Sequence, residues 1–274
     1  MSNTQLRIIS AAVMALIVSI CLFLGEKTTL LFIMVAGVLS TDEIYCNFLK
    51  KKRFGGLYFV SQALFAAPFI YFNFISDNGE AFDHFILSSL VLNFFLIYYL
   101  FFMKMSSRNV IKVMTKAPFL AGIVLLLPFM SLTALFSSEK WLSWIAVILL
   151  VNFGMDTGAW FFGKNFGKRK LWPSVSPKKT VEGLLGGMLT SSVLGGLAFY
   201  FLFERSAFFV WPLFFMLGGV SQLGDLVQSK LKRQFGIKDS SSLIPGHGGV
   251  YDRIDSLLFL SPFFVWALKA AGRI

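Results

Sequence analysis

Nine apolar segments, each long enough to cross a membrane as a helix, take up most of the chain and constrain its fold more than any other feature. A helix needs about 20 apolar residues to span a hydrocarbon core about 30 Å thick. The segments cover residues 6–24, 29–48, 54–75, 84–103, 118–136, 141–163, 183–203, 207–227 and 251–270. They predict an all-α polytopic membrane protein with about nine transmembrane helices and no soluble domain.

The composition agrees with lipid as the solvent. Hydrophobic residues make up 56% of the 274 residues and charged residues only 14%, whereas soluble proteins carry about 25% charge. A net charge of +11 could indicate a nucleic-acid partner, but the basic residues lie in short connections, so we expect none. Cys21 and Cys46 have no paired spacing and predict neither a disulfide framework nor a metal site.

The first apolar segment has a second interpretation as a cleaved signal peptide. Its basic flank is a single Arg7, and no small-residue cleavage pattern follows it. Both features differ from those of signal peptides. We therefore expect residues 6–24 to be a retained span.

The charges of the connections predict an orientation. Four connections are basic, and they alternate with neutral or acidic ones that hold Asp77, Glu80 and Asp83. The basic connections are residues 49–53, 104–117, 164–182 and 228–250. By the positive-inside rule they are cytoplasmic, which puts the N-terminus in the cytoplasm. The C-terminus then lies outside, and the basic residues Lys269 and Arg273 near it run against this scheme.

Because connections 164–182 and 228–250 face the same compartment, they predict one active site on the cytoplasmic side of the C-terminal half. We therefore divide the chain into residues 1–140, which hold no recognised motif, and a catalytic region at 141–274.

The stretch from Ser229 to Asp255 carries the most chemistry. It first supplies four cations suited to phosphate charges, namely Lys230, Lys232, Arg233 and Lys238. Glycines at 246, 248 and 249 then surround His247 and allow a close approach of backbone N–H groups to a ligand. Asp252, Arg253 and Asp255 follow at the start of the last span, where an acid requires a partner or a function.

The same stretch resembles the signature of the phosphatidate cytidylyltransferase family. The matching residues are Ser229, Lys232, Arg233, Lys238, Asp239, Pro245, Gly246, His247, Gly248, Gly249, Asp252, Arg253 and Asp255. Three further motifs resemble that family: Asp156-Thr157-Gly158-Ala159, Ser176-Pro177-Lys178-Lys179-Thr180 and Ser221-Gln222-Leu223-Gly224-Asp225. The resemblance covers about residues 152 to 258.

The resemblance implies transfer of a cytidylyl group from CTP to phosphatidic acid, which gives CDP-diacylglycerol and pyrophosphate. It also implies Mg²⁺ as the cofactor, with Asp225 and Asp252 as its first ligands. The alternative metal ligands are Asp156, Asp239 and Asp255, and a second metal ion is left open. The implied setting is a homodimer in a bacterial cytoplasmic (inner) membrane.

The expected site residues fall into two groups. The catalytic group is Asp225, Asp252, Lys232, Arg233, His247 and Arg253. The substrate-binding group is Ser176, Lys178, Lys179, Ser229, Lys238, Gly246, Gly248 and Gly249. Plainer interpretations remain for several of them: the lysines are solvated in loops, the serines cap helices, and His247 caps its turn.

Two features outside these groups have open interpretations. Asp42 and Glu43 lie near the cytoplasmic end of the second span. They either reach the site or face water at a helix end. The glycines around residue 183 to 187, and Gly218-Gly219, predict close helix packing.

Two rival functions remain. One is a CTP-dependent lipid kinase, which would transfer the terminal phosphoryl group to a polyprenol-type alcohol. The other is a transporter for a phosphorylated solute, since intramembrane acids and basic loops also suit that class. Transporters are often built from related halves, and this sequence shows no internal repeat.

Overall fold

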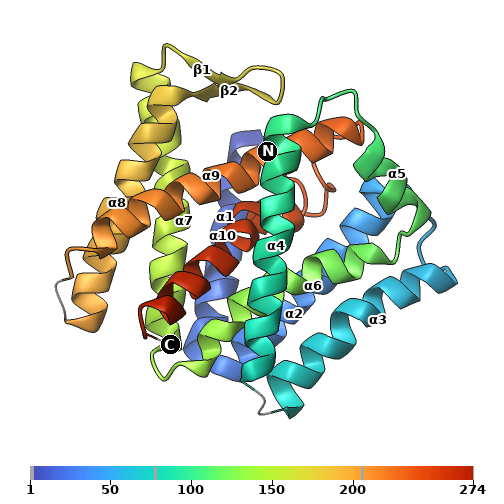
Figure 1. Cartoon of the computed structure of the whole chain (residues 1–274), viewed down its shortest axis with the longest axis horizontal. Coiled ribbons are helices and arrows are strands. Elements are labelled where there is room, and N and C mark those ends of the chain that lie inside the picture. Colours follow the sequence, from blue (N-terminus) through green and yellow to red (C-terminus); the bar gives the residue numbers. More distant parts are fainter. Residues whose placement is uncertain (1–2, 77–78, 205–206, 274) are drawn as a thin grey trace. The chain divides into compact units, whose positions relative to one another are not determined.

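The computed structural model describes residues 3–76, 79–204 and 207–273. Within these ranges the chain is helical apart from one two-stranded hairpin and its connections (Figure 1). Eight of the described helices are long and apolar enough to cross a membrane. The prediction of an all-α polytopic membrane protein is therefore confirmed. The orientation and the number of spans stay predictions.

Ten α-helices make up the described part of the chain. They are α1 (Asn3–Leu24), α2 (Glu26–Glu43), α3 (Gly56–Ile70), α4 (Glu80–Phe102), α5 (Asn109–Lys116), α6 (Leu120–Thr133), α7 (Trp141–Phe166), α8 (Val181–Phe203), α9 (Val210–Gln234) and α10 (Tyr251–Ala270). Short turns of other helix types extend three of them: π-helical η1 (Ile44–Phe48), π-helical η2 (Tyr71–Ile75) and 3₁₀-helical η3 (Ala134–Ser137).

Each predicted span coincides with a helix, but the last helix lacks the composition of the others. Helix α10 occupies the predicted residues, yet Asp252, Arg253 and Asp255 lie in its first turns and Lys269 near its end. It is not among the eight helices that qualify by length and composition. Its charged start therefore does not suit a hydrocarbon core.

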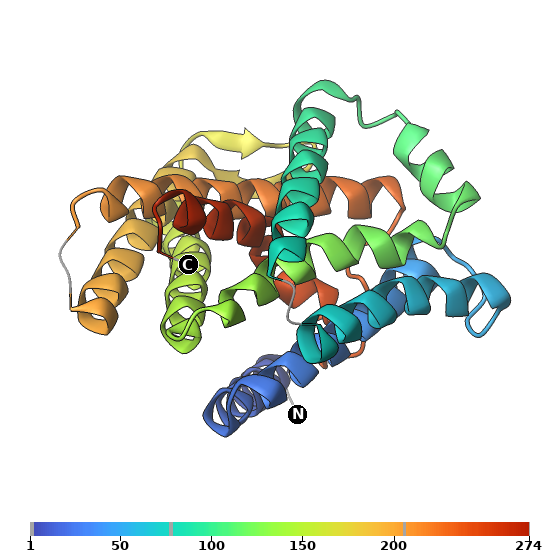
Figure 2. The ribbon, with the colours of Figure 1, turned by 60° about the horizontal axis from the view of Figure 1, so that its bottom comes forward.

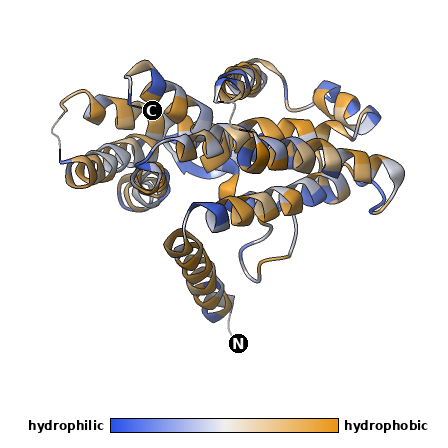
Figure 3. Cartoon of the chain, turned by 90° about the horizontal axis from the view of Figure 1, so that it is seen from below, coloured by the Kyte–Doolittle hydropathy of each residue, from blue (hydrophilic) through white to orange (hydrophobic). Residues whose placement is uncertain are grey.

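Large apolar side chains face outward along the helices. Phe23 is 91% exposed, Phe102 73% and Phe201 71%. Figure 3 shows hydrophobic residues around most of the helix that starts at the N-terminal label. Such surface would promote association in water, whereas hydrocarbon solvates it. The exposed phenylalanines therefore support membrane-embedded helices.

The described residues pack into two compact units, and the first contains the chain up to Ser88, Lys104–Thr133 and Lys232–Ile254. In it α2, α3 and α6 pack against one another. A Cβ at Gly122 of α6 would lie 2.0 Å from the carbonyl oxygen of Ser61 in α3. Only glycine permits this close approach. The same unit holds the loop that joins α9 to α10.

The second unit contains Ser89–Met103, Ala134–Leu231 and the described chain from Asp255 onward. Helices α7 and α8 lie side by side in it (Figure 2). A Cβ at Gly187 would lie 2.7 Å from the carbonyl oxygen of Met155, and one at Gly218 would lie 2.6 Å from Ser191 Oγ. The predicted close packing at these glycines is therefore confirmed.

The connection between α7 and α8 is more ordered than the predicted loop. Strands β1 (Lys170–Trp172) and β2 (Ser176–Thr180) form an antiparallel hairpin there. The Glu182 carboxylate at the start of α8 accepts the backbone N–H groups of Lys168 (3.0 Å) and Arg169 (3.1 Å). These bonds fix the first strand to the helix that follows the second.

Other connections also differ from expectation. Helix α9 continues to Gln234, so the first residues of the predicted loop 228–250 are helical. The connection 104–117 contains the short helix α5. Asp77 lies outside the described residues. The two units are interleaved along the chain. They are a different division from the one at residue 140, which stays a prediction.

Candidate active site

The Pro-Gly-His-Gly segment before α10 forms a tight turn in the first unit. The N–H of Ile244 donates to the carbonyl of Gly248 (2.8 Å), and the N–H of His247 donates back to Ile244 (2.9 Å). Gly246 and Gly248 have φ values of 76° and 85°. This left-handed region favours glycine. The turn explains why glycines flank His247.

Asp252 lies directly behind this turn and is held by three donors. Its Oδ1 accepts Lys232 Nζ at 2.8 Å, and its Oδ2 accepts the N–H groups of Ser240 (2.7 Å) and Gly249 (3.0 Å). The Asp252 side chain is 3% exposed and that of Lys232 11%. The structure thus brings together an acid and a cation that the sequence predicted for the site. It also fixes the orientation of the carboxylate.

His247 has a polar partner on α1. Its Nδ1 lies 2.7 Å from Ser10 Oγ, which is also 3.0 Å from the carbonyl oxygen of Pro245. Desolvation lowers the pKa of His247 below its usual value, and the positive charges of Arg253 and Arg7 lower it further. A neutral imidazole is therefore favoured near neutral pH. It can bind to a serine hydroxyl in either tautomer.

The second unit contains a separate acid–cation pair. Strand β2 brings Lys179 to Asp225 of α9, and the two side chains form an ion pair. Gln222 Nε2 and Ser229 Oγ lie 3.5 and 3.4 Å from the Asp225 carboxylate. The Asp225 side chain is 31% exposed, so one side of it remains accessible. The hairpin thus positions Lys179 beside Asp225.

Several predicted site residues lie outside these two clusters. In the first unit, those that are exposed are Arg233, Lys238, Asp239, Gly246 and Arg253. In the second unit, Asp156 and Lys178 are exposed, and Ser176 is half-buried. Asp255 is buried and accepts the N–H of Ser256 at 2.8 Å. None of these positions contradicts a binding role, and their assignments stay predictions.

Lys230 differs from the other cations of its run. Its Nζ is buried against the end of α4 and donates to the carbonyls of Tyr99 (2.7 Å), Leu100 (3.0 Å) and Met103 (2.5 Å). The interpretation of four adjacent phosphate-binding cations is therefore wrong for this residue. Lys230 caps a helix, because the last carbonyls of a helix lack partners of their own.

The two clusters suit a hard divalent cation. The described residues contain no group of three or more His, Cys, Asp or Glu that could hold a metal ion. Mg²⁺ does not require one, since it binds through one or two carboxylates, substrate oxygens and water. Each unit offers one carboxylate beside a lysine, Asp252 in the first and Asp225 in the second. These oxygen donors fit Mg²⁺.

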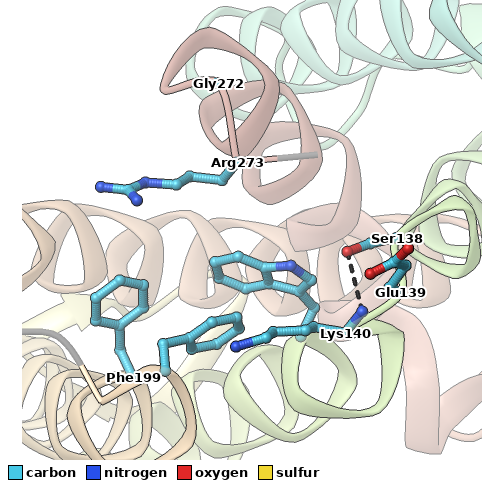
Figure 4. Close-up of a pocket in the computed structure, with 8 residues that line it drawn as sticks. Ser138, Glu139, Lys140, Phe199, Gly272 and Arg273 are labelled. Atoms are coloured by element: carbon cyan, nitrogen blue, oxygen red, sulfur yellow. Dashed lines mark hydrogen bonds between the residues drawn. The ribbon is translucent and has the colours of Figure 1, made fainter.

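A pocket of about 370 Å³ in the second unit is unrelated to these clusters. It is lined by Ser138, Glu139, Lys140, Trp144, Phe199, Phe203, Gly272 and Arg273 (Figure 4). None of the predicted site residues lines it. The lining comes from the connection before α7, the start of α7, the end of α8 and the residues after α10, whereas Asp156 lies in the second half of α7.

One acid that bonds to the loop before Asp252 was not assigned a role from the sequence. Glu43, at the end of α2, is 3% exposed and bonds to the loop between α9 and α10. The available signal was an acid at the end of an apolar segment, which requires a compensating partner. No local sequence pattern identifies that partner, because Ser240 lies 197 residues further along the chain.

Comparison with known proteins identifies the family of this chain. Residues 5–271 match the model of the Cytidylyltransferase family. Over 262 residues the chain is 32% identical to the phosphatidate cytidylyltransferase of Staphylococcus haemolyticus (strain JCSC1435). This match covers 94% of this chain and 96% of the relative.

Two shorter matches have higher identity. The chain is 44% identical over 122 residues to the phosphatidate cytidylyltransferase of Staphylococcus aureus (strain COL), which is 44% of this chain and 47% of the relative. It is 44% identical over 129 residues to that of Bacillus subtilis (strain 168), which is 46% of this chain and 48% of the relative. The chain thus spans about half the length of these two relatives.

Proposed function

The chain belongs to the cytidylyltransferase family, and on this premise we propose that it transfers a cytidylyl group from CTP to phosphatidic acid, giving CDP-diacylglycerol and pyrophosphate. The observation that carries the proposal is the buried pair of Lys232 and Asp252 behind the glycine turn. Both residues of this pair belong to the family signature.

The reaction joins two anions. A phosphate oxygen of phosphatidic acid attacks the α-phosphorus of CTP and forms a new P–O bond. The bond from the α-phosphorus to the oxygen that bridges to the β-phosphate breaks, and pyrophosphate leaves with that electron pair. Neutralising the charge is therefore the main task of the site. A phosphomonoester has its second pKa near 6, so the attacking oxygen needs no general base.

The cations of the two clusters are suited to this task. Lys232 and Lys179 are each paired with a carboxylate in the structure, which keeps their ammonium groups in place. We assign them to the phosphates of CTP and to the departing pyrophosphate, together with the exposed Arg233, Lys238 and Arg253. The glycine turn supplies backbone N–H groups that can approach a phosphate closely.

Asp225 and Asp252 are the proposed ligands of Mg²⁺. When bound, the ion supplies positive charge at the phosphate oxygens. The oxygens of Asp252 are oriented by two backbone amides and by Lys232, and Asp225 is accessible on one side. The proposal leaves open a second ion with Asp156, Asp239 or Asp255 as its ligand.

The proposal also includes a homodimer in a bacterial cytoplasmic membrane. The bacterial relatives and the helical spans support this location, because outer-membrane proteins cross the bilayer as β-barrels. The homodimer rests on the resemblance to the family. Light scattering of the purified protein in detergent would give its mass, and a mass of one chain would contradict the dimer.

The reaction is tested with CTP that carries a radiolabel on either the α- or the γ-phosphate. With phosphatidic acid and Mg²⁺, α-label is expected to enter the lipid phase and γ-label to leave as pyrophosphate. Asp252→Asn should lower this rate about 100-fold or more, the usual effect of losing one charged group that acts in the transition state. Transfer of γ-label to lipid would instead establish the kinase. If folded protein moves neither label, the enzyme proposal fails.

A further inference from the structure

Glu43 is a buried acid far from the family signature in sequence. Glu43 is the last residue of α2 and is 3% exposed, and the π-helical turn η1 begins directly after it. Burying an ionised carboxylate costs several kcal/mol unless donors replace its water. The donors that surround Glu43 therefore show what it does.

Four donors meet at this carboxylate, two on each oxygen. Oε1 accepts Ser241 Oγ (2.7 Å) and the N–H of Val250 (2.9 Å). Oε2 accepts Ser240 Oγ (2.8 Å) and the N–H of Tyr251 (2.9 Å). Each oxygen thus binds one hydroxyl from the middle of the loop and one backbone amide from the junction between the loop and α10. The carboxylate thus links the middle of the loop between α9 and α10 to the start of α10.

The two backbone amides are those at the start of α10. The first N–H groups of a helix have no partner within it, and an acid near them is stabilised by the helix dipole. Such a cap normally comes from the residue just before the helix. Here Val250 and Tyr251 are capped from α2, and Asp252 is the next residue. The cap therefore fixes the backbone from which Asp252 extends.

Gly249 owes its identity to this carboxylate. A Cβ at residue 249 would lie 2.4 Å from Glu43 Oε2 and 2.0 Å from Ser240 Oγ. Real Cβ atoms do not come so close to other heavy atoms. The second glycine of the Gly-Gly pair thus makes room for Glu43, whatever it does for a phosphate.

The residues after Glu43 bind to the same loop. Asn47 Nδ2 donates to the carbonyl of Ser240 at 2.6 Å. All three polar groups of Ser240 are then bonded, because its N–H donates to Asp252 and its hydroxyl to Glu43. The ring of Phe48 packs edge-on against Tyr251. The end of α2 and η1 therefore support both the middle of the loop and the start of α10.

We propose that Glu43 is a positioning residue, which holds the start of α10 so that Asp252 points toward Lys232. The inference rests on the proposed function for its kinetic part. It assigns a specific task to the N-terminal half of the chain, in which the sequence shows no motif.

The test compares Glu43→Gln, Glu43→Asp and Glu43→Ala in the full-length protein in detergent. The amide nitrogen of glutamine cannot accept a hydrogen bond, so Glu43→Gln leaves at least one backbone amide without an acceptor, while the serine hydroxyls can rotate. We expect kcat to fall 10- to 100-fold, which is typical for residues that orient a ligand of a metal. The Mg²⁺ concentration for half-maximal rate should rise, and KM for CTP should change less.

A second measurement is independent of catalysis. Hydrogen exchange of the Val250 and Tyr251 amides should be faster in Glu43→Gln, and Glu43→Asp should restore part of both the exchange protection and the rate. If wild-type protein proves inactive, exchange still decides the role of Glu43, while the proposed function fails on its own. If Glu43→Gln does not fold, Ser241→Ala removes one donor from Oε1 and should shift exchange in the same direction.

The matched control is Asp42→Asn. Asp42 is the adjacent acid, and it binds Arg53 and Tyr58 rather than the loop. It should leave the exchange of the Val250 amide and the Mg²⁺ dependence as in wild type. The proposal is overturned if folded Glu43→Gln keeps the wild-type kcat, Mg²⁺ dependence and exchange rates. It is also overturned if Asp42→Asn shifts them equally.

Discussion

Lys230 and Lys232 stand two residues apart in α9, and a methionine at each position is expected to impair a different property of the protein. Lys230 Nζ donates to three carbonyls at the end of α4 and lies 4.5 Å from the centre of the Tyr99 ring. Lys232 Nζ binds Asp252. Methionine keeps most of the length of lysine and removes its charge. Lys230→Met should therefore lower stability, and Lys232→Met should lower the rate.

The magnitude follows from the contacts of Lys230. A hydrogen bond to a charged group contributes about 1.5–3 kcal/mol. The three bonds share one ammonium group, so they do not add fully. A cation at a helix C-terminus contributes up to about 2 kcal/mol more when partly buried. We expect a loss of about 3 kcal/mol, which is roughly a hundredfold change in the folded-to-unfolded ratio.

The assay is thermal unfolding in detergent, followed by far-UV circular dichroism, with steady-state kinetics on the folded protein. The control is Lys104→Met, which removes an exposed charge near the same helix end. Lys230→Met should unfold at a lower temperature than the control and keep the wild-type KM for CTP. A Lys230→Met protein with wild-type stability and a raised KM would refute the helix cap and make Lys230 a phosphate ligand.

Three further predictions concern the glycine turn, His247 and the hairpin. Gly249→Ala should reduce activity strongly, because its Cβ would collide with the Glu43 carboxylate; a fully active variant would contradict the described turn. NMR titration should give His247 a pKa below its ordinary 6.5, since desolvation and then the charge of Arg253 lower it. The stability this provides is present above pH 6.5 and is lost as the pH falls through the lowered pKa. Arg253→Gln should raise that pKa, and an unchanged value would exclude this cause. Glu182→Gln should speed proteolysis of the hairpin, because the carboxylate binds two amides at its base; equal cleavage of the variant and wild type would exclude that anchor.

The helices could be predicted because their signal is local. A run of apolar residues is visible in the sequence itself, and α8 was expected at 183–203 and is found at Val181–Phe203. The hairpin could not be predicted in the same way. Residues 170–180 are rich in lysine and lack the alternation of a half-buried strand. The hairpin is held instead by the Glu182 carboxylate, which accepts the backbone N–H groups of Lys168 and Arg169 just before the first strand.

The site shows the same limit. The sequence identified Asp252 and Lys232 through a family signature, and the structure places them together. It could not separate Lys230 from Lys232, because the carbonyls that bind Lys230 lie about 130 residues earlier in the chain. Successive residues of a helix are about 100° apart, so two lysines two positions apart lie on nearly opposite sides of the helix and meet different surroundings. Only the tertiary structure identifies those surroundings.

The π-helical turn η1 makes the number of residues after Glu43 as important as their identity. A π-turn contains one residue more than the α-turn that it replaces. Deleting one residue from Ile44–Phe48 would restore the α-helical repeat and rotate the following side chains by about 100°. Asn47 would then turn away from Ser240, and the ring of Phe48 from Tyr251. Over evolution this segment should therefore keep its length, and an insertion or deletion in it should be as disruptive as the loss of Asn47 or Phe48.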